Sequence, residues 1–292
     1  MDKKISQAYH KAARKFQGTR LASNKYIKII HHNLSKILRS RVNEGDLSAC
    51  WINYDGAKLY IDPQDLIGGA LYSTGEYEPN VKRVINNILV EGDTAIDVGA
   101  HIGHNTVTMR NAVGIDGKVL AFEPHPKSAS YIKKTIEKNH WSNVELIEKA
   151  LSNEMGSKKL IEKSSNTGGS TLQNRPLEQF PEMKFEGTKY KVSTERLSDF
   201  LTKNNIGTVN LVKVDIEGAE FEVISDISEK LGQISHILLE IHTKKLEDEE
   251  VDKIYNILSK NGSMKYLQKE ETVRRQNLHH GDQILWTSEG TV

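Results

Sequence analysis

Two acidic residues lie at the ends of predicted strands, at positions that suit a nucleoside-containing ligand. Asp97 lies near the end of the first strand, and Gly99 and Gly103 after it let the chain turn sharply and let a ligand approach the backbone. The second strand runs into Glu123, whose carboxylate can accept hydrogen bonds from both hydroxyls of a ribose. Asp97 would repel a pyrophosphate but suits an ammonium or sulfonium group. The pair therefore predicts a site for S-adenosylmethionine rather than for a dinucleotide.

A second acidic group lies farther along the chain, in the sequences LVKVDIEGAE and ILLEIH. Strand alternation places Lys213 and Asp215 on one face, and it places Glu240 and His242 on one face at the end of the next strand. Removing a proton from a hydroxyl needs a carboxylate or an imidazole within hydrogen-bond reach. We expect Asp215 beside the reacting group, with His242 or Glu240 as the proton acceptor. The candidate catalytic residues are Asp215, Glu217, Glu240 and His242.

Each of these residues also has a structural interpretation. Glu217 and Glu220 can serve the N-terminus of the next helix, and Lys213 can be a salt-bridge partner. A divalent metal could bind the same carboxylates and the imidazole. The spacing matches no recognisable metal-ligand pattern, so no metal ligands are assigned and metal binding stays unproven.

Several motifs together resemble the FkbM-type family of S-adenosylmethionine-dependent methyltransferases, over about residues 75–262. They are TAIDVGAHIGHNT, LAFEPHP, IEKALSN, LVKVDIEGAEFEVI and ILLEIH. The resemblance implies a class I methyltransferase fold and O-methylation of a hydroxyl, often on a sugar, a polyketide or another secondary metabolite. The residues that match the first cofactor motif are Asp97, Gly99, Ala100, His101, Gly103, Asn105 and Thr106. The resemblance also assigns Glu123 and Pro124 to the ribose, Ala150 to the adenine and Glu78 to the cofactor's amino acid end.

The elements that must position these residues follow an alternating pattern. Continuous apolar runs predict strands at 94–98, 118–122, 144–149, 209–214 and 234–241, and helical periodicity predicts helices near 104–113, 126–139, 217–230 and 246–261. Strands of this kind, separated by helices, indicate an α/β fold with a doubly wound, mainly parallel, Rossmann-like sheet. We expect the segment 152–200 to supply loops and a strand pair over the active face.

The part of the chain before this sheet divides into two predicted regions. Residues 1–45 form a basic helical arm, and residues 46–74 form a small β-hairpin around Asp55-Gly56, followed by a glycine-containing loop that acts as a linker. A helix is expected to open at Pro79. The S-adenosylmethionine-binding methyltransferase domain is predicted at 75–292.

The basic arm contrasts with the balanced charge of the whole chain. The 292 residues carry 40 Lys and Arg against 39 Asp and Glu, whereas residues 1–45 contain only Asp2 and Glu44 as acids. Apolar residues at helical spacing predict an amphipathic helix at about 24–41. We favour a helix that packs on the protein or mediates self-association. The alternative is a surface for anionic lipid or nucleic acid.

The composition also limits the expected cellular location and the possible functions of the protein. A single cysteine, Cys50, excludes a disulfide framework within one chain, and the N-terminal sequence lacks the apolar stretch of a signal peptide. We expect a cytoplasmic protein, with peripheral membrane attachment as an alternative. The predicted function is O-methylation of a small-molecule or glycan hydroxyl. RNA 2′-O-methylation and a non-catalytic cofactor-binding module remain alternatives. Methylation of a nucleic-acid base amine is disfavoured, because enzymes of that kind usually have a Pro-Pro-aromatic loop after the fourth strand and no two prolines are adjacent in this sequence.

Overall fold

The computed structural model describes residues 48–163, 166–172, 188–267 and 271–289. The chain divides into two compact units, residues 1–79 and 80–292. The predicted basic arm at 1–45 lies outside the described residues. Among the residues that are described, no helix is long and apolar enough to cross a membrane.

A β-hairpin opens the described part of the first unit, as the sequence predicts. Strand β1 (Cys50–Tyr54) pairs antiparallel with β2 (Ala57–Ile61). Asp55 and Gly56 form the turn, with left-handed φ values of 49° and 79°. Left-handed φ at both central positions is the turn geometry that Asp-Gly favours in hairpins.

Helix α3 (Leu66–Thr74) follows where the sequence predicted a loop, and that prediction was wrong. The side chain of Asp65 caps the helix by accepting hydrogen bonds from the backbone N of Ile67 at 3.0 Å and of Gly68 at 3.4 Å. Gly68 is required by close packing rather than by a loop conformation, because a Cβ there would lie 2.1 Å from the carbonyl oxygen of Asp62.

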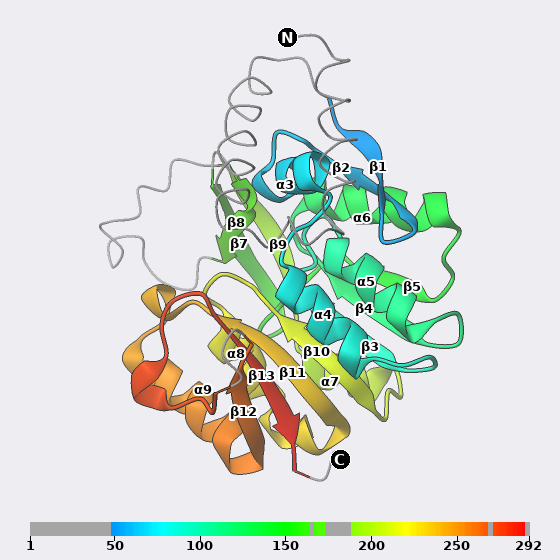
Figure 1. Cartoon of the computed structure of the whole chain (residues 1–292). Helices are drawn as coiled ribbons and strands as arrows, with labels where there is room; N and C mark the ends of the chain where they lie inside the picture. Colours follow the sequence, from blue (N-terminus) through cyan, green and yellow to red (C-terminus); the bar gives the residue numbers. More distant parts are fainter. Residues whose placement is uncertain (1–47, 164–165, 173–187, 268–270, 290–292) are drawn as a thin grey trace, which may run out of the picture. The chain divides into compact units, whose positions relative to one another are not determined.

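A seven-stranded sheet lies at the centre of the second unit, in the order β12-β13-β11-β10-β3-β4-β5 (Figure 1). The strands β3, β4, β5, β10 and β11 are parallel, and β13 is antiparallel to both of its neighbours. This doubly wound order confirms the predicted class I methyltransferase, Rossmann-like fold. The strands are β3 (Thr94–Val98), β4 (Lys118–Phe122), β5 (Val144–Ile147), β10 (Val209–Val214), β11 (Ile234–Ile241), β12 (Gly262–Tyr266) and β13 (Asp282–Ser288).

Helices cover both faces of this sheet, and each face has its own apolar core. On one face, α4 and α5 pack with alternate residues such as Ala95 and Leu211. On the other face, α7, α8 and α9 pack with the intervening residues, such as Ile96 and Val212. The helices are α4 (Pro79–Ile88), α5 (His104–Val113), α6 (Pro126–Asn139), α7 (Leu197–Lys203), α8 (Glu220–Asp226) and α9 (Asp248–Asn261). The described residues also include the short 3₁₀ segments η3 (Ser228–Gln233), η4 (Thr243–Lys245) and η5 (Arg275–Asn277).

The structure corrects the bounds of a predicted strand and of a predicted helix. The strand expected at 144–149 ends at Ile147. The helix expected at 217–230 ends at Asp226, before η3, and it begins only at Glu220, because Glu217 and Gly218 have left-handed φ values of 57° and 108° that a right-handed helix does not allow.

A second, four-stranded sheet accounts for much of the segment in which loops and a strand pair were expected. Its order is β6-β9-β7-β8, with β7 antiparallel to both neighbours. The strands are β6 (Ala150–Leu151), β7 (Gly156–Lys163), β8 (Asn166–Leu172) and β9 (Lys189–Glu195). This sheet brings residues from β7 and β8 to the pocket described next.

Candidate active site

A pocket lies at the carboxyl ends of β3, β4 and β10. This is the edge at which doubly wound sheets bind their ligands. The predicted cofactor residues that line it are Gly99, His101, Glu123, Pro124 and Ala150, and the predicted catalytic residues that line it are Asp215 and Glu217. The remaining predicted cofactor residues, Glu78, Asp97, Ala100, Gly103, Asn105 and Thr106, are not among the lining residues.

Gly99 allows the ends of β3 and β10 to come together at the pocket. Its φ is 79°, and a Cβ at this position would lie 2.0 Å from the carbonyl oxygen of Asp215. The backbone N of Asp215 in turn donates to the carbonyl oxygen of Val98 at 3.2 Å. Any larger residue at position 99 would push apart the two segments that carry the predicted cofactor and catalytic residues.

The carboxylate of Glu123 is held by two backbone N–H groups. Oε2 accepts from the N of His101 at 2.7 Å, and Oε1 accepts from the N of His125 at 2.8 Å. His101 reaches this position with a left-handed φ of 51°. Burial raises the pKa of Glu123 to about 7, although the two N–H groups oppose that rise by favouring the carboxylate.

Asp97 lies beside the pocket without lining it. Its side chain is fully buried, and Oδ2 accepts a hydrogen bond from the hydroxyl of Thr106 at 2.6 Å. Its Oδ1 lies 4.0 Å from the Nζ of Lys213, which is opposite Asp97 in the register of β3 and β10. Burial raises the pKa of Asp97, and the charge of Lys213 opposes the rise. In this structure the cation beside Asp97 is thus a lysine of the protein itself.

Four other residues that were predicted to bind the cofactor lie outside the pocket lining. Ala100 and Asn105 are buried, and Gly103, with φ of 85°, precedes α5 and packs its backbone against Ile132 of α6. Glu78 belongs to the first unit and has a left-handed φ of 48° just before α4. Its role near the cofactor stays a prediction.

Asp215 lines the pocket and also belongs to the second acidic group, which includes Glu240 and His242. The Nζ of Lys213 donates to its Oδ2 at 3.3 Å, which agrees with the predicted alternation of β10. Burial would raise the pKa of Asp215, but the charges of Lys213 and His242 outweigh burial and lower it. Asp215 is therefore a carboxylate at neutral pH.

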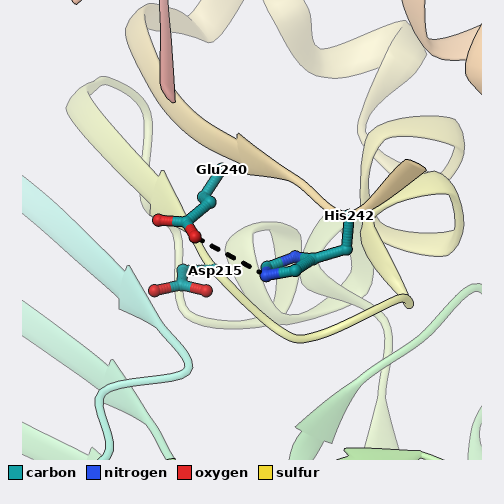
Figure 2. A group of neighbouring side chains, drawn as sticks. All are labelled: Asp215, Glu240 and His242. Atoms are coloured by element: carbon teal, nitrogen blue, oxygen red, sulfur yellow. Dashed lines mark ion pairs between the residues drawn. The ribbon is translucent and has the colours of Figure 1, made fainter. Parts of the chain in front are cut away.

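Asp215, Glu240 and His242 lie together, as predicted from the ends of neighbouring strands (Figure 2). Their nearest nitrogen and oxygen atoms are all within 4.8 Å of one another, and Nε2 of His242 is 3.6 Å from Oε1 of Glu240. On the other side of the ring, Nδ1 of His242 is 2.7 Å from Oε1 of Glu220. Glu220 is fully buried, so it is a supporting residue of the site rather than only a helix N-terminal acid.

The charge of His242 differs from the sequence-based expectation. Burial disfavours the imidazolium, but the hydrogen bond with Glu220 and the charges of Glu220, Glu217 and Asp215 outweigh burial and raise the pKa of His242 to about 9. The prediction that this histidine titrates near neutrality was wrong. In this arrangement the ring is protonated at pH 7 and cannot accept a proton.

Glu217 faces this cluster from the loop after β10. Its Oε2 is 3.4 Å from Nε2 of His242 and also binds the Nζ of Lys245. The structure thus gives Glu217 a role in holding the loop as well as in lining the pocket.

Sequence reasoning missed the pocket residues that come from outside the main sheet. Lys149, which pairs with Glu195, precedes β6, and the second sheet supplies four others. These are Leu151, Leu160, Ser170 and Leu172. The segment 152–200 has no motif that marks the last three, because their position depends on the pairing of β7 with β8 and β9.

The family model of the FkbM methyltransferase domain matches residues 97–264, which is more than half of the chain. The matched region contains both acidic groups and most of the central sheet. The protein therefore belongs to the FkbM methyltransferase family, as the sequence motifs predicted.

Three known proteins illustrate the similarity. Methyltransferase 1 of Beauveria bassiana is 31% identical over 161 residues, 50% of this chain and 63% of that protein, so the chain matches less than two thirds of that relative's length. Hexuronic acid methyltransferase AglP of Haloferax volcanii is 24% identical over 212 residues, 68% of this chain and 78% of AglP. The structure of an S-adenosylmethionine-dependent O-methyltransferase from Thermotoga maritima aligns with a TM-score of 0.39 and 15% identity, covering 82% of this chain and 77% of that one.

Proposed function

We propose that this protein transfers a methyl group from S-adenosylmethionine to a hydroxyl of a sugar, a glycan or a secondary metabolite. The observation that carries the proposal is that Glu123 and Asp215 line one pocket. They follow β4 and β10, on either side of β3. The first carboxylate suits a nucleoside and the second suits a reacting hydroxyl.

The side chains that line the pocket suit S-adenosylmethionine. Each oxygen of Glu123 accepts one backbone hydrogen bond, which leaves acceptor capacity for the two ribose hydroxyls. Pro124 and Ala150 offer apolar surface beside this carboxylate, and Asp215 and Glu217 supply negative charge that attracts a sulfonium.

Asp215 is the residue that we assign to the acceptor. When bound, the cofactor supplies an electrophilic methyl group on a positively charged sulfur. Asp215 would orient the acceptor hydroxyl by accepting its hydrogen bond, so that the oxygen lone pair attacks the methyl carbon. The O–C bond forms, the S–C bond breaks with its electrons on sulfur, and the hydroxyl proton passes to Asp215 and then to water.

One relative favours a sugar acceptor. AglP is named a hexuronic acid methyltransferase, and its alignment spans most of both chains. We therefore place hexuronic acid glycans first among the acceptors to test, followed by neutral sugars and polyketide alcohols. A hexuronic acid offers both hydroxyls and a carboxylate, so the position of the methyl group must be determined.

The test has two stages. Calorimetry with S-adenosylmethionine and S-adenosylhomocysteine measures cofactor binding, and labelled S-adenosylmethionine then reports methyl transfer to uronic glycans, neutral sugars, polyketide alcohols and RNA. We expect saturable cofactor binding and transfer to a sugar or metabolite hydroxyl. Because methyl esters are cleaved by mild alkali and methyl ethers are not, alkali treatment of the product identifies the linkage.

Four outcomes would contradict the proposal. Absence of cofactor binding would remove its basis, and alkali-labile product would show carboxyl rather than hydroxyl methylation. Transfer only to RNA, with binding that falls steeply with salt, would favour the RNA methyltransferase. Cofactor binding without transfer to any acceptor would favour a non-catalytic module.

A further inference from the structure

Three side chains at the ends of β10 and β11 converge on one point next to the pocket. Asp215 and Glu240 each offer an oxygen and His242 offers Nε2, and these atoms lie within 4.8 Å of one another (Figure 2). Asp215 lines the pocket, whereas Glu240 and His242 do not. The set combines one imidazole nitrogen with two carboxylate oxygens, which is a common donor set for divalent transition ions.

The imidazole is held in the orientation that a metal ligand needs. His242 is 4% exposed, and its Nδ1 lies 2.7 Å from Oε1 of the fully buried Glu220. A carboxylate on Nδ1 fixes the ring and keeps the proton on that nitrogen, so Nε2 is directed at Asp215 and Glu240. Carboxylate–histidine pairs of this kind typically support a metal ligand from behind.

Negatively charged side chains surround Nε2 of His242. Among the residues that the structure describes, two lysines pair with members of this group: Lys213 beside Asp215, shared with Asp97, and Lys245 beside Glu217. A cation that takes the place of the proton on Nε2 leaves the imidazole neutral, and its two positive charges would offset part of the surrounding negative charge. The four carboxylates around His242 are Asp215, Glu217, Glu220 and Glu240.

We propose that Asp215, Glu240 and His242 bind one divalent transition-metal cation, for which Mn²⁺ is the probe. Ligand atoms about 2.1 Å from an octahedral ion lie about 3 Å apart when adjacent and about 4.2 Å apart when opposite. Nε2 of His242 and Oε1 of Glu240, at 3.6 Å, already fall between these values. Small side-chain rotations bring the third ligand atom within the same range.

The position of this site gives the cation a role in the proposed reaction. Asp215 has two carboxylate oxygens, so one can hold the cation while the other faces the pocket. A cation there would bind the acceptor's hydroxyl oxygen and lower its pKa. This role rests on the proposed function, whereas binding of the cation does not.

The experiment measures Mn²⁺ binding to the tag-free, chelator-stripped full chain by electron paramagnetic resonance of the free ion. We expect one saturable Mn²⁺ per chain, displaced by Zn²⁺. Glu240→Gln and His242→Gln should each weaken Mn²⁺ binding by about tenfold or more, and Glu220→Gln, which acts through the imidazole, by about 10- to 100-fold. Glu249→Gln on α9 removes a carboxylate whose side chain is 77% exposed, and it should leave Mn²⁺ binding unchanged.

Two controls distinguish loss of the metal site from misfolding and from failure of the cofactor site. Circular dichroism melting without metal must show that each variant is folded, and Glu240→Gln keeps an oxygen that can accept from Nε2 of Gln283. Calorimetry with S-adenosylmethionine in chelator tests the cofactor site separately. Absence of saturable Mn²⁺ binding up to millimolar concentration, or equal binding by the wild type and the folded Glu240→Gln and His242→Gln variants, would overturn the metal site even if the cofactor binds.

Discussion

The backbone N of His101 donates a hydrogen bond of 2.7 Å to Oε2 of Glu123, which joins the turn after β3 to the end of β4. His101 has a left-handed φ of 51° in this turn. The bond fixes one oxygen of Glu123, and His125 fixes the other. The proposed ribose acceptor is thus oriented before any ligand arrives, which reduces the entropy cost of binding.

Replacing Glu123 with Gln should weaken S-adenosylmethionine binding by about tenfold or more. The substitution removes the charge that strengthens hydrogen bonds to the ribose hydroxyls. It also replaces one carboxylate oxygen with an NH₂ group, which cannot accept from His101 or His125. Calorimetry of the purified variant measures the change in affinity.

The matched control for this variant is Glu145→Gln on β5. That glutamate is half exposed and pairs only with Lys118 among the described residues, so its loss should not affect the cofactor. Equal cofactor affinity for the wild type and the Glu123→Gln variant would show that the nucleoside binds elsewhere.

The affinity for S-adenosylmethionine should increase with pH through about pH 7. Burial raises the pKa of Glu123 to about 7, with the charge of Asp97 adding to the rise and that of Lys213 opposing it. Ribose hydroxyls donate to the ionised carboxylate, so the protonated form must lose its proton on binding. If only the ionised form binds, affinity should rise about tenfold between pH 6 and pH 8.

Calorimetry at several pH values, in buffers with different ionisation enthalpies, measures both the affinity and the proton release. Proton release should be largest below pH 7 and should vanish above pH 8. Because the cofactor itself has titratable groups, the Glu123→Gln variant is the reference. The same pH slope in that variant would assign the dependence to another group.

The central sheet and the two acidic groups could be predicted because the signals for them are local. Apolar runs such as Thr94–Val98 mark buried strands, and Asp97 and Glu123 stand directly at strand ends. The start of α8 could not be placed, since a Cβ on Gly218 would lie 2.8 Å from Cβ of Lys245 and the chain turns left-handed there. That restriction comes from a residue far along the sequence.

The supporting contacts of the site were also beyond sequence reasoning. Glu220 reaches His242 only because α8 packs beside the end of β11, and nothing in the spacing of the two residues predicts contact. The charge of His242 follows from that contact, so its pKa could not be placed either. Leu160 and Leu172 likewise reach the pocket only through the pairing of β7 and β8.

Replacing Lys213 with Met should destabilise the protein by about 3–5 kcal/mol. The ammonium group is 3.3 Å from Asp215 and 4.0 Å from the fully buried Asp97, and its loss leaves both carboxylates without their lysine. Adding Asp97→Asn to the variant should restore part of the lost stability, because it removes one uncompensated buried charge. Urea unfolding of the single and double variants measures these free energies.

Lys118→Met provides the comparison for this prediction. Lys118 is on the neighbouring strand β4 and pairs with Glu145, but both side chains are about half exposed. Its loss should therefore cost no more than about 1 kcal/mol. Similar losses for the two lysines would mean that Lys213 is not needed to compensate the buried acids.

Replacing Asp215 with Asn should lower the rate of the methyl-transfer step by about 10²- to 10⁴-fold with little effect on cofactor affinity. Asp215 lines the pocket and is ionised, whereas Glu240 and His242 do not line it. A sugar hydroxyl is a very weak acid, so its proton needs an acceptor in the transition state. Single-turnover assays with an identified acceptor measure this step apart from product release.

Glu240→Gln and His242→Gln complete the series and distinguish a base from a supporting residue. If Asp215 is the proton acceptor, these two variants should lose less activity than Asp215→Asn, and added Mn²⁺ should recover part of the loss by restoring occupancy of the weakened site. Asp215→Asn should not recover, because the missing group itself accepts the proton. A near-normal rate for Asp215→Asn, beside a large loss for Glu240→Gln, would move the proton acceptor from the pocket wall to β11.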